Sequence, residues 1–182
     1  DFRFGRARSG TVDTLKNLAP DIDIMQMSAL SEHDLVVSSS EIRKKVAEGK
    51  IEVAASLLGR PYSLQGVVIS GEKRGRKLGF PTANIQSDYD LIPETGVYAV
   101  RVSIDHGDWK DGIANLGYNP TFQGQKFKIE VHLFGFSSDI YGSDIEVQFI
   151  NRIRSERCFP SAEELVHQLS LDIQKAKSLL AL

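Results

Sequence analysis

Phe127-Lys128-Ile129-Glu130-Val131-His132-Leu133 alternates apolar and polar side chains over its whole length. Because successive side chains of a β-strand point to opposite faces, this pattern predicts a strand with one buried face and one wet face. Residues 98–104 and 145–149 alternate in the same way. Turns rich in Gly, Pro, Asn and Asp separate these short segments, which favours a closed antiparallel barrel or a sandwich over a parallel sheet. From Tyr62 onward the chain is therefore expected to be mainly β.

The first 58 residues have a different pattern, with helical and strand-like segments side by side. Thr11–Leu18 has helical spacing, and Ile22–Met27 is interpreted as a short buried strand. Ser38-Ser39-Ser40-Glu41 is a capping box that opens a helix, which Gly49 would close. This part of the chain is predicted to have α/β character, with too few strands to form a sheet of its own.

Two further helices are expected. The first, over Ile51–Leu58, would end at Gly59. The second begins at the capping box Ser161-Ala162-Glu163-Glu164 and carries an apolar stripe at three- and four-residue steps, formed by Leu165, Leu169, Ile173, Ala176 and Leu180. We expect this C-terminal stripe to pack against the barrel in a structural role.

The composition is that of an ordinary globular protein. The chain has 182 residues, 41% of them hydrophobic, which is long enough for one sizeable core. A net charge of −2 and an aromatic content of 8% argue against a nucleic-acid-binding protein. Cys158 is the only cysteine, which is typical of a reducing compartment. No apolar run has membrane-spanning length and the N-terminus does not resemble a leader, so we expect a cytoplasmic protein without a membrane or an obligate protein partner.

A glycine-rich loop carries the strongest chemical signal. Residues 71–84 read Gly-Glu-Lys-Arg-Gly-Arg-Lys-Leu-Gly-Phe-Pro-Thr-Ala-Asn. Backbone N–H groups and cations in such a loop suit phosphate groups. The residues predicted to hold a nucleotide are Gly71, Lys73, Arg74, Gly75, Arg76, Lys77, Gly79 and Thr82. The loop is not a Walker A motif, because no Gly-Lys-Ser/Thr closes it, and the sequence shows no protein-kinase motif set.

Thr82 and Asn84 are predicted to bind Mg2+. Side chains two residues apart in an extended segment point to the same side, so these two can share one partner. Their hydroxyl and amide oxygens are hard donors of the kind that Mg2+ takes, and Mg2+ usually keeps waters and substrate phosphates in its other positions. Pro81 lacks an N–H and is therefore suited to the start of a strand or to an edge.

The series of motifs resembles the riboflavin kinase family, and specifically the kinase module of bacterial bifunctional riboflavin kinase/FAD synthetases. The first motif is the glycine-rich loop that ends in Pro81-Thr82-Ala83-Asn84. The others follow in the family order: Leu91-Ile92-Pro93, Gly96-Val97-Tyr98-Ala99-Val100, Ala114-Asn115-Leu116-Gly117-Tyr118-Asn119-Pro120-Thr121-Phe122, Ile129-Glu130-Val131-His132-Leu133, Tyr141-Gly142 and Arg154-Ser155-Glu156-Arg157-Cys158-Phe159. The resemblance covers about residues 59–182 and implies a barrel of roughly six strands.

The resemblance also implies roles for individual residues. Glu130 matches the family's catalytic glutamate and would accept the proton of a ribityl hydroxyl, while Thr82 and Asn84 match its metal ligands. The residues expected at the flavin are Arg154, Glu156, Phe159 and Asn115. His132 shares the face of Glu130, where it either helps to position the site or only packs. Gly135 stands where the family commonly has an acidic residue, so no acid is expected to act there.

The N-terminal part resembles the end of the FAD synthetase (nucleotidyltransferase) module. The segments that carry this likeness are Asp1–Gly5 and Val37–Arg43. The family's adenylylation chemistry also needs a His-x-Gly-His motif, and none of the four histidines lies in one. We therefore expect residues 1–58 to be a remnant of that module, residues 59–182 to be the kinase domain, and this chain to be unable to make FAD.

The expected reaction transfers the γ-phosphate of ATP to the ribityl 5′-hydroxyl of riboflavin, giving FMN and ADP, with Mg2+ as cofactor. ATP and CTP stay open as alternatives for the nucleotide. A non-catalytic flavin or nucleotide sensor on the same barrel is the alternative function, since the fold does not decide between them. Glu130 together with Thr82 and Asn84 favours the enzyme, because a pure binding protein does not need a positioned base.

Overall fold

The computed structural model describes residues 2–32, 35–121 and 124–181, and it divides the chain into two compact units, Asp1–Val36 and Val37–Leu182. The first unit contains the 3-10 helix η1 (Arg6–Arg8), helix α1 (Val12–Leu18) and the short antiparallel strands β1 (Ser31–Glu32) and β2 (Leu35–Val36). The expected helix after Thr11 is confirmed: the Thr11 hydroxyl accepts a hydrogen bond from the Thr14 backbone N–H at 3.2 Å and caps α1.

The buried strand expected at Ile22–Met27 is wrong. Residues 23–30 form neither helix nor strand, and the side chains of Met25 and Met27 are 86% and 85% exposed. An apolar run becomes a buried strand only where neighbouring strands pair with it and another layer covers it. Among the described residues of this unit, strands β1 and β2 pair with each other, so the segment has no ladder to join.

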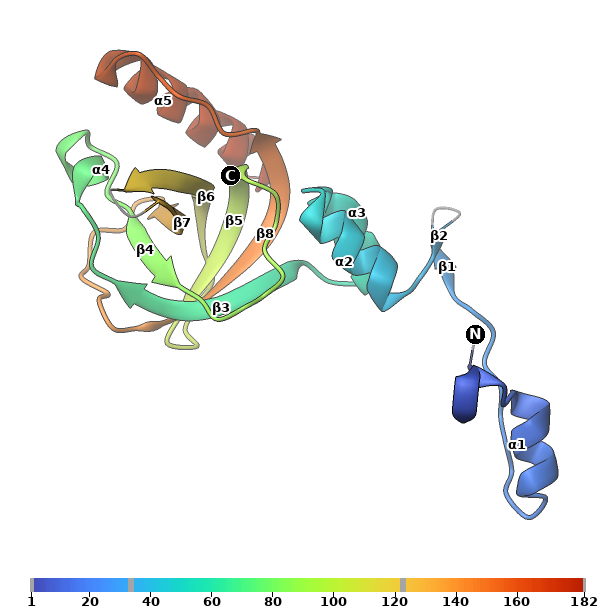
Figure 1. Ribbon diagram of the computed structural model, residues 1–182. Helices are drawn as coiled ribbons and strands as arrows, with labels where there is room; N and C mark the ends of the chain where they lie inside the picture. The colour runs from blue at the N-terminus through green and yellow to red at the C-terminus, as the bar shows by residue number, and fades with distance from the viewer. Residues whose placement is uncertain (1, 33–34, 122–123, 182) are drawn as a thin grey trace. The chain divides into compact units, whose positions relative to one another are not determined.

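The second unit is a closed six-stranded antiparallel barrel with helices on its outside, which confirms the expected fold class (Figure 1). Its strands lie in the order β3-β4-β7-β6-β5-β8 around the barrel. The strands span Tyr62–Ile69 (β3), Ala83–Gln86 (β4), Gly96–Ile104 (β5), Lys110–Thr121 (β6), Gly124–Leu133 (β7) and Asp144–Arg154 (β8). The helices of this unit are α2 (Ser39–Ala47), α3 (Ile51–Leu58), α4 (Arg74–Lys77) and α5 (Ala162–Leu179).

Helices α2 and α3 follow the predicted caps. The Ser38 hydroxyl accepts from the Glu41 N–H at 3.2 Å at the start of α2, and Gly59 ends α3 in the left-handed conformation. Val46, Ile51 and Ala54 from these helices belong to the same hydrophobic cluster as the barrel interior. Residues 39–58 therefore pack as part of the barrel unit, while the division of the chain at residues 58 and 59 stays a prediction.

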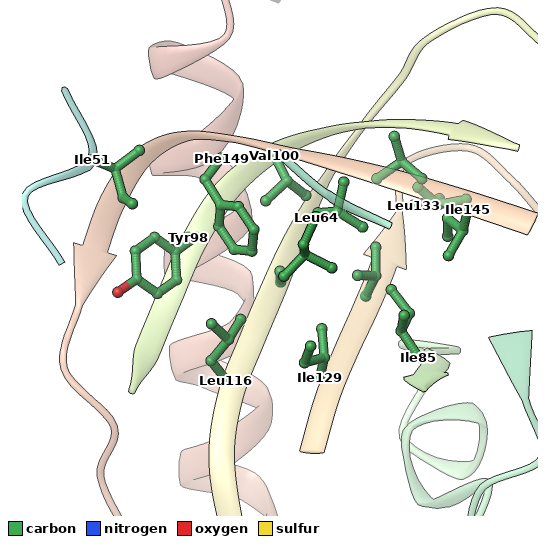
Figure 2. Packing of buried hydrophobic residues seen from close by; sticks show 14 of the residues in the cluster. Ile51, Leu64, Ile85, Tyr98, Val100, Leu116, Ile129, Leu133, Ile145 and Phe149 are labelled. Carbon is green, nitrogen blue, oxygen red and sulfur yellow. The ribbon is translucent and has the colours of Figure 1, made fainter. Parts of the chain in front are cut away.

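The barrel interior is filled by the apolar side chains that the alternating pattern assigns to one face (Figure 2). The most deeply buried of the large side chains are Tyr98 and Phe149, whose rings meet edge to face with centroids 5.4 Å apart. Ile129, Val131 and Leu133 of β7 point into this core, which leaves Glu130 and His132 on the outer face. The predicted alternation of β7 is thus confirmed.

The alternation predicted a wet outer face for β5, but α5 covers this face at Val97 and Ala99, while Arg101 stays exposed. Ala99 is fully buried in a second hydrophobic cluster outside the barrel, together with Val97, Ile113, Ile153, Ala176 and Leu180. Helix α5 packs against β5, β6 and β8 on the outside of the barrel (Figure 1). The predicted apolar stripe of this helix is therefore what buries the second face of the strand.

Candidate functional site

The strand register brings together residues that are far apart in sequence. Asn84 of β4 pairs with Glu130 of β7, and Glu130 pairs with Asn115 of β6. Asn115 in turn pairs with Val97 of β5, which pairs with Arg154 of β8. Directly paired residues have Cβ atoms about 4.5–5.5 Å apart. One continuous row on five adjacent strands thus holds an amide, a carboxylate, a second amide and a guanidinium.

This row forms the floor of a cavity of about 290 Å³, which we call the first cavity. It lies between the glycine-rich loop and the segment that follows β8. Its polar lining contains the predicted catalytic and metal-binding side chains, Glu130, Thr82 and Asn84, with Asn115, Arg154 and Glu156. Its apolar lining comes from Leu78, Phe80, Phe159, Leu165 and Leu169. The first cavity thus combines a polar floor with apolar and aromatic walls.

Glycines let the loop approach the two oxygen donors closely. A methyl group added to Gly71 would lie 2.1 Å from Nδ2 of Asn84, and one added to Gly75 would lie 2.3 Å from the Phe80 carbonyl oxygen and 3.3 Å from Oγ1 of Thr82. Glycine is therefore needed at both positions because the loop packs directly against these atoms, which leaves no room for a larger side chain. The loop and the segment from Pro81 to Asn84 form one packed substructure, as the sequence pattern suggested.

A second cavity, of about 230 Å³, lies on the other side of the same loop. It is closed by the connection between β7 and β8, which contributes Phe136, Ile140 and Tyr141. Lys73 and Thr82 line both cavities, and Lys73 Nζ lies 5.7 Å from the centre of the Tyr141 ring. The two cavities thus meet at a cation and a hydroxyl group.

The predicted nucleotide-binding residues are distributed unevenly. Arg76 lines the second cavity, and Gly75 the first. Gly71 lies behind Asn84, and Gly79 follows α4 and lines neither cavity. The side chains of Arg74 and Lys77 lie outside the described part of the structure.

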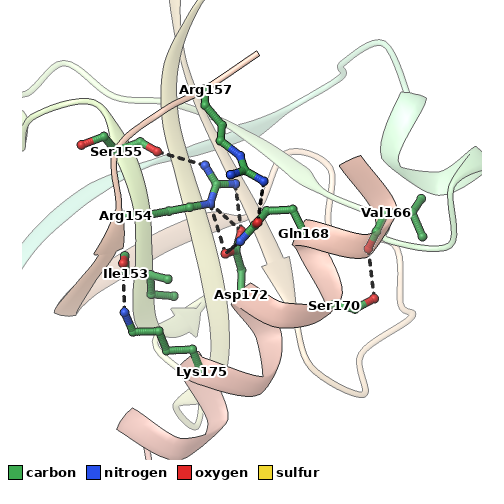
Figure 3. Close-up of polar contacts among 9 residues, drawn as sticks. All are labelled: Ile153, Arg154, Ser155, Arg157, Val166, Gln168, Ser170, Asp172 and Lys175. Atoms are coloured by element: carbon green, nitrogen blue, oxygen red, sulfur yellow. Dashed lines mark hydrogen bonds and ion pairs between the residues drawn. The ribbon is translucent and has the colours of Figure 1, made fainter. Parts of the chain in front are cut away.

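A network of polar contacts holds the segment after β8 against α5 (Figure 3). Arg154 Nε donates to both carboxylate oxygens of Asp172, at 3.1 and 2.9 Å, and its terminal Nη2 lies 2.8 Å from Oδ2. Gln168 donates to the same carboxylate at 2.7 Å and accepts from Arg157 at 2.6 Å. Because Asp172 already takes up one side of its guanidinium, Arg154 acts here as a structural anchor as well as a cavity wall.

Phe159 is held over the first cavity by these arginines. The guanidinium carbons of Arg157 and Arg154 lie 4.6 and 5.6 Å from the centre of its ring. Glu156 lies against β6, since a methyl group added to Gly117 would overlap its carboxylate. The predicted flavin-binding residues thus surround one cavity, and their roles there stay predictions.

Two residues with open roles can now be placed. The His132 ring lines the first cavity, and its Nδ1 lies 2.8 Å from the Pro81 carbonyl oxygen. Gly135 has φ of +61°, in the left-handed region that favours glycine, in the turn that follows β7. The backbone conformation therefore gives a physical reason for the glycine found there.

The sequence analysis missed Asp172 and the part that α5 takes in the site. Asp172 is 2% exposed and lies seven residues after Leu165, on the apolar face of the helix. A single acid inside such a stripe is the signal that could have found it, since a buried carboxylate needs a partner. Leu165 and Leu169 of the same helix face the cavity, so α5 contributes to the site as well as to the core.

The chain is similar to proteins of one known family. The riboflavin kinase family (Flavokinase) matches residues 58–180. The bifunctional riboflavin kinase/FMN adenylyltransferases of Bacillus subtilis and Haemophilus influenzae are 41% and 40% identical to this chain, over 97% and 98% of it. The chain spans 57% and 58% of the lengths of these relatives.

A crystal structure described as a macrolide-efflux protein from Streptococcus pneumoniae is also similar. It superposes with a TM-score of 0.89 and 34% identity, over 97% of this chain and 58% of that one. Within the described residues of the present chain, we find no helix with the length and apolar character needed to cross a membrane. The match over residues 58–180 shows that this chain belongs to the riboflavin kinase family.

Proposed function

We propose that this chain transfers the γ-phosphate of ATP to the 5′-hydroxyl of riboflavin, giving FMN and ADP. The observation that carries this proposal is the row Asn84–Glu130–Asn115, which lies in the first cavity beside Thr82. Phosphoryl transfer to an alcohol depends mainly on positioning and on charge stabilisation. Such a row offers a base for the hydroxyl next to oxygen donors for a metal.

The two cavities suit the two substrates. The first cavity has flat apolar side chains, Phe80 and Phe159, that can cover an isoalloxazine ring, and polar groups on its floor for the ribityl chain. The second cavity has an aromatic and aliphatic wall for a nucleobase. The phosphates would then lie where the cavities meet, beside Lys73 and Thr82, which line both. In this proposal the transferred phosphate would lie between its donor and its acceptor.

Thr82 and Asn84 fit a magnesium ion bound together with the nucleotide. Both are neutral oxygen donors that line the first cavity, and Mg2+ takes most of its remaining ligands from phosphates and water. When bound, the ion would neutralise charge on the phosphate oxygens. Gly71 behind Asn84 leaves room for the amide at this position, since any larger residue would displace it.

Glu130 is the proposed general base. Its neighbours Ile129 and Val131 are buried in the barrel, which fixes the backbone from which the carboxylate points into the first cavity. A carboxylate in this place can accept the proton of the ribityl 5′-hydroxyl as the oxygen attacks the γ-phosphate. The neighbouring amide of Asn115 lies on the same row and supports the substrate end of the site.

The relatives named above are bifunctional, and we propose that a longer protein containing this chain would also adenylylate FMN. In that protein residues 1–58 would complete the adenylyltransferase domain and residues 59–182 would form the kinase domain. We place the reaction in the cytoplasm, where ATP is available and where the single Cys158 stays reduced. No protein partner is needed for the proposed kinase reaction, because one cavity system holds both substrates.

The test is an FMN-formation assay with ATP, Mg2+ and riboflavin on the chain and on Glu130→Gln. Loss of a general base lowers kcat by roughly 10²- to 10⁴-fold, so Glu130→Gln is expected to fall by this factor. Glu146→Gln is a matched control, because Glu146 lies on β8 and lines neither cavity. An unimpaired Glu130→Gln would reject the base. Binding of flavin by a wild-type chain that forms no FMN would favour the sensor.

A further inference from the structure

The pairing between β4 and β7 includes Asn84 but stops before Thr82, the other residue that we assign to the metal. Ala83 pairs with Val131 and is the first residue of the β4 ladder, so Pro81 and Thr82 lie beyond it. The Pro81 carbonyl is met instead by a side chain, since Nδ1 of His132 lies 2.8 Å from it. A carbonyl oxygen can only accept, so the imidazole carries its proton on Nδ1 and donates. His132 thus extends the ladder by one hydrogen bond.

The imidazole ring is held between two aromatic rings, and the strand that carries it is fixed by its backbone pairing. It meets the rings of Phe80 and Phe134 edge to face, with centroids 5.8 and 6.1 Å apart, and its backbone pairs with Ile113 of β6. Aromatic pairs of this kind restrict the orientation of a ring. The donor therefore comes from a group that is itself fixed.

The acceptor lies next to one of the torsion angles that set the direction of Thr82. The Pro81 carbonyl belongs to the planar peptide unit that leads into Thr82. The φ angle of a proline is set by its ring, so ψ of Pro81 is the remaining free rotation before Thr82. A hydrogen bond to the carbonyl oxygen restricts this rotation and with it the direction in which Thr82 leaves the loop.

We infer that His132 is a positioning residue, which orients Thr82 toward the metal-nucleotide through the Pro81 carbonyl. The inference rests on the proposed function and adds to it a role that separates His132 from Glu130, two residues away on the same face of β7. Glu130 acts on the flavin hydroxyl, whereas His132 acts on the nucleotide side. Loss of the Nδ1–H donor therefore weakens use of the nucleotide more than it weakens riboflavin binding.

Three substitutions separate the effect of losing the N–H donor from the effect of losing the ring. His132→Asn keeps an N–H donor close to the place of Nδ1. His132→Gln moves the donor one carbon further out, and His132→Phe keeps a ring without a donor. Steady-state FMN formation gives kcat and the KM for Mg2+·ATP, fluorescence quenching gives the riboflavin Kd, and thermal unfolding reports stability.

His132→Phe and His132→Gln are expected to lower kcat/KM for Mg2+·ATP about tenfold, the ratio that corresponds to one net hydrogen bond. His132→Asn is expected to stay within about threefold of the wild type. The riboflavin Kd should change by the same factor in His132→Asn and His132→Gln, because both remove the ring that packs on Phe80 in the first cavity. Equal values for His132→Asn and His132→Gln would overturn the inference, as would a loss confined to riboflavin binding. The Asn and Gln variants alone decide the matter where His132→Phe does not fold.

The proposed function and this inference fail in different ways. A wild-type chain that forms no FMN removes the proposed function. The role of His132 is then decided by titration with Mg2+·ADP, for which the same order of affinities is expected: wild type and His132→Asn above His132→Gln and His132→Phe. Four equal affinities would overturn the inference there also.

Discussion

Asp172→Asn tests how strongly α5 holds the wall of the first cavity. The carboxylate is 2% exposed and pairs with both Nε and Nη2 of Arg154, while the Arg154 side chain is 19% exposed. Removing one partner of a buried ion pair typically costs about 3–5 kcal/mol, because the other charge is left without compensation. Since water reaches part of Arg154, we expect the lower end, about 3 kcal/mol. For a protein of this size, that loss lowers Tm by about 6–12 °C.

Chemical denaturation of the chain and of three variants measures this cost. Asp111→Asn is the matched control, because the Arg101–Asp111 pair is exposed, with side chains 48% and 23% accessible, and such pairs contribute less than about 1 kcal/mol. In the double variant Arg154→Leu/Asp172→Leu no charge is left unpaired, so it should be more stable than Asp172→Asn. A loss in Asp172→Asn no larger than in Asp111→Asn would refute the reasoning.

Two further predictions concern the metal ligands and the core tyrosines. Gly71→Ala places a methyl group against the Asn84 amide, which is free to rotate away. We therefore expect a Tm within about 2 °C of wild type but a higher Mg2+ concentration for half-maximal FMN formation. An unchanged Mg2+ titration would contradict this. Burial raises the pKa of Tyr62 and of Tyr98 to about 12, above about 10 in the unfolded chain. The folded state thus loses these protons at a higher pH than the unfolded chain, so the free energy of unfolding should fall as pH rises from 10 to 12. The fall should be less steep in Tyr62→Phe and Tyr98→Phe, as urea unfolding at each pH would measure.

Local patterns in the sequence were sufficient to predict most of the secondary structure. The caps at Ser38, Gly59 and Ser161 act through their own neighbours in sequence, and the alternation of β7 reports directly on the two environments at its faces. The strand expected at Ile22–Met27 failed because a strand also needs partners, which a local pattern does not contain.

The candidate site could be predicted only as separate residues. Resemblance identified Glu130, Thr82 and Asn84, but their meeting in one cavity follows from the register of β4, β7 and β6, which is a property of the closed barrel. The contact of His132 with the Pro81 carbonyl depends on where the β4 ladder ends. A side chain that replaces a missing ladder bond leaves no periodic signal in the sequence.

In the proposed complex, the metal-nucleotide at Thr82 and Asn84 lies next to the ribityl end of riboflavin, and the isoalloxazine ring lies beneath Phe159. Replacing Mg2+ by paramagnetic Mn2+ in the complex with ADP and riboflavin tests this directly, because the ion broadens the proton NMR signals of groups near it. We expect strong broadening of the ribityl protons at the 5′ end and much weaker broadening of the ring methyl protons. Equal broadening of both, or stronger broadening of the ring methyls, would contradict it.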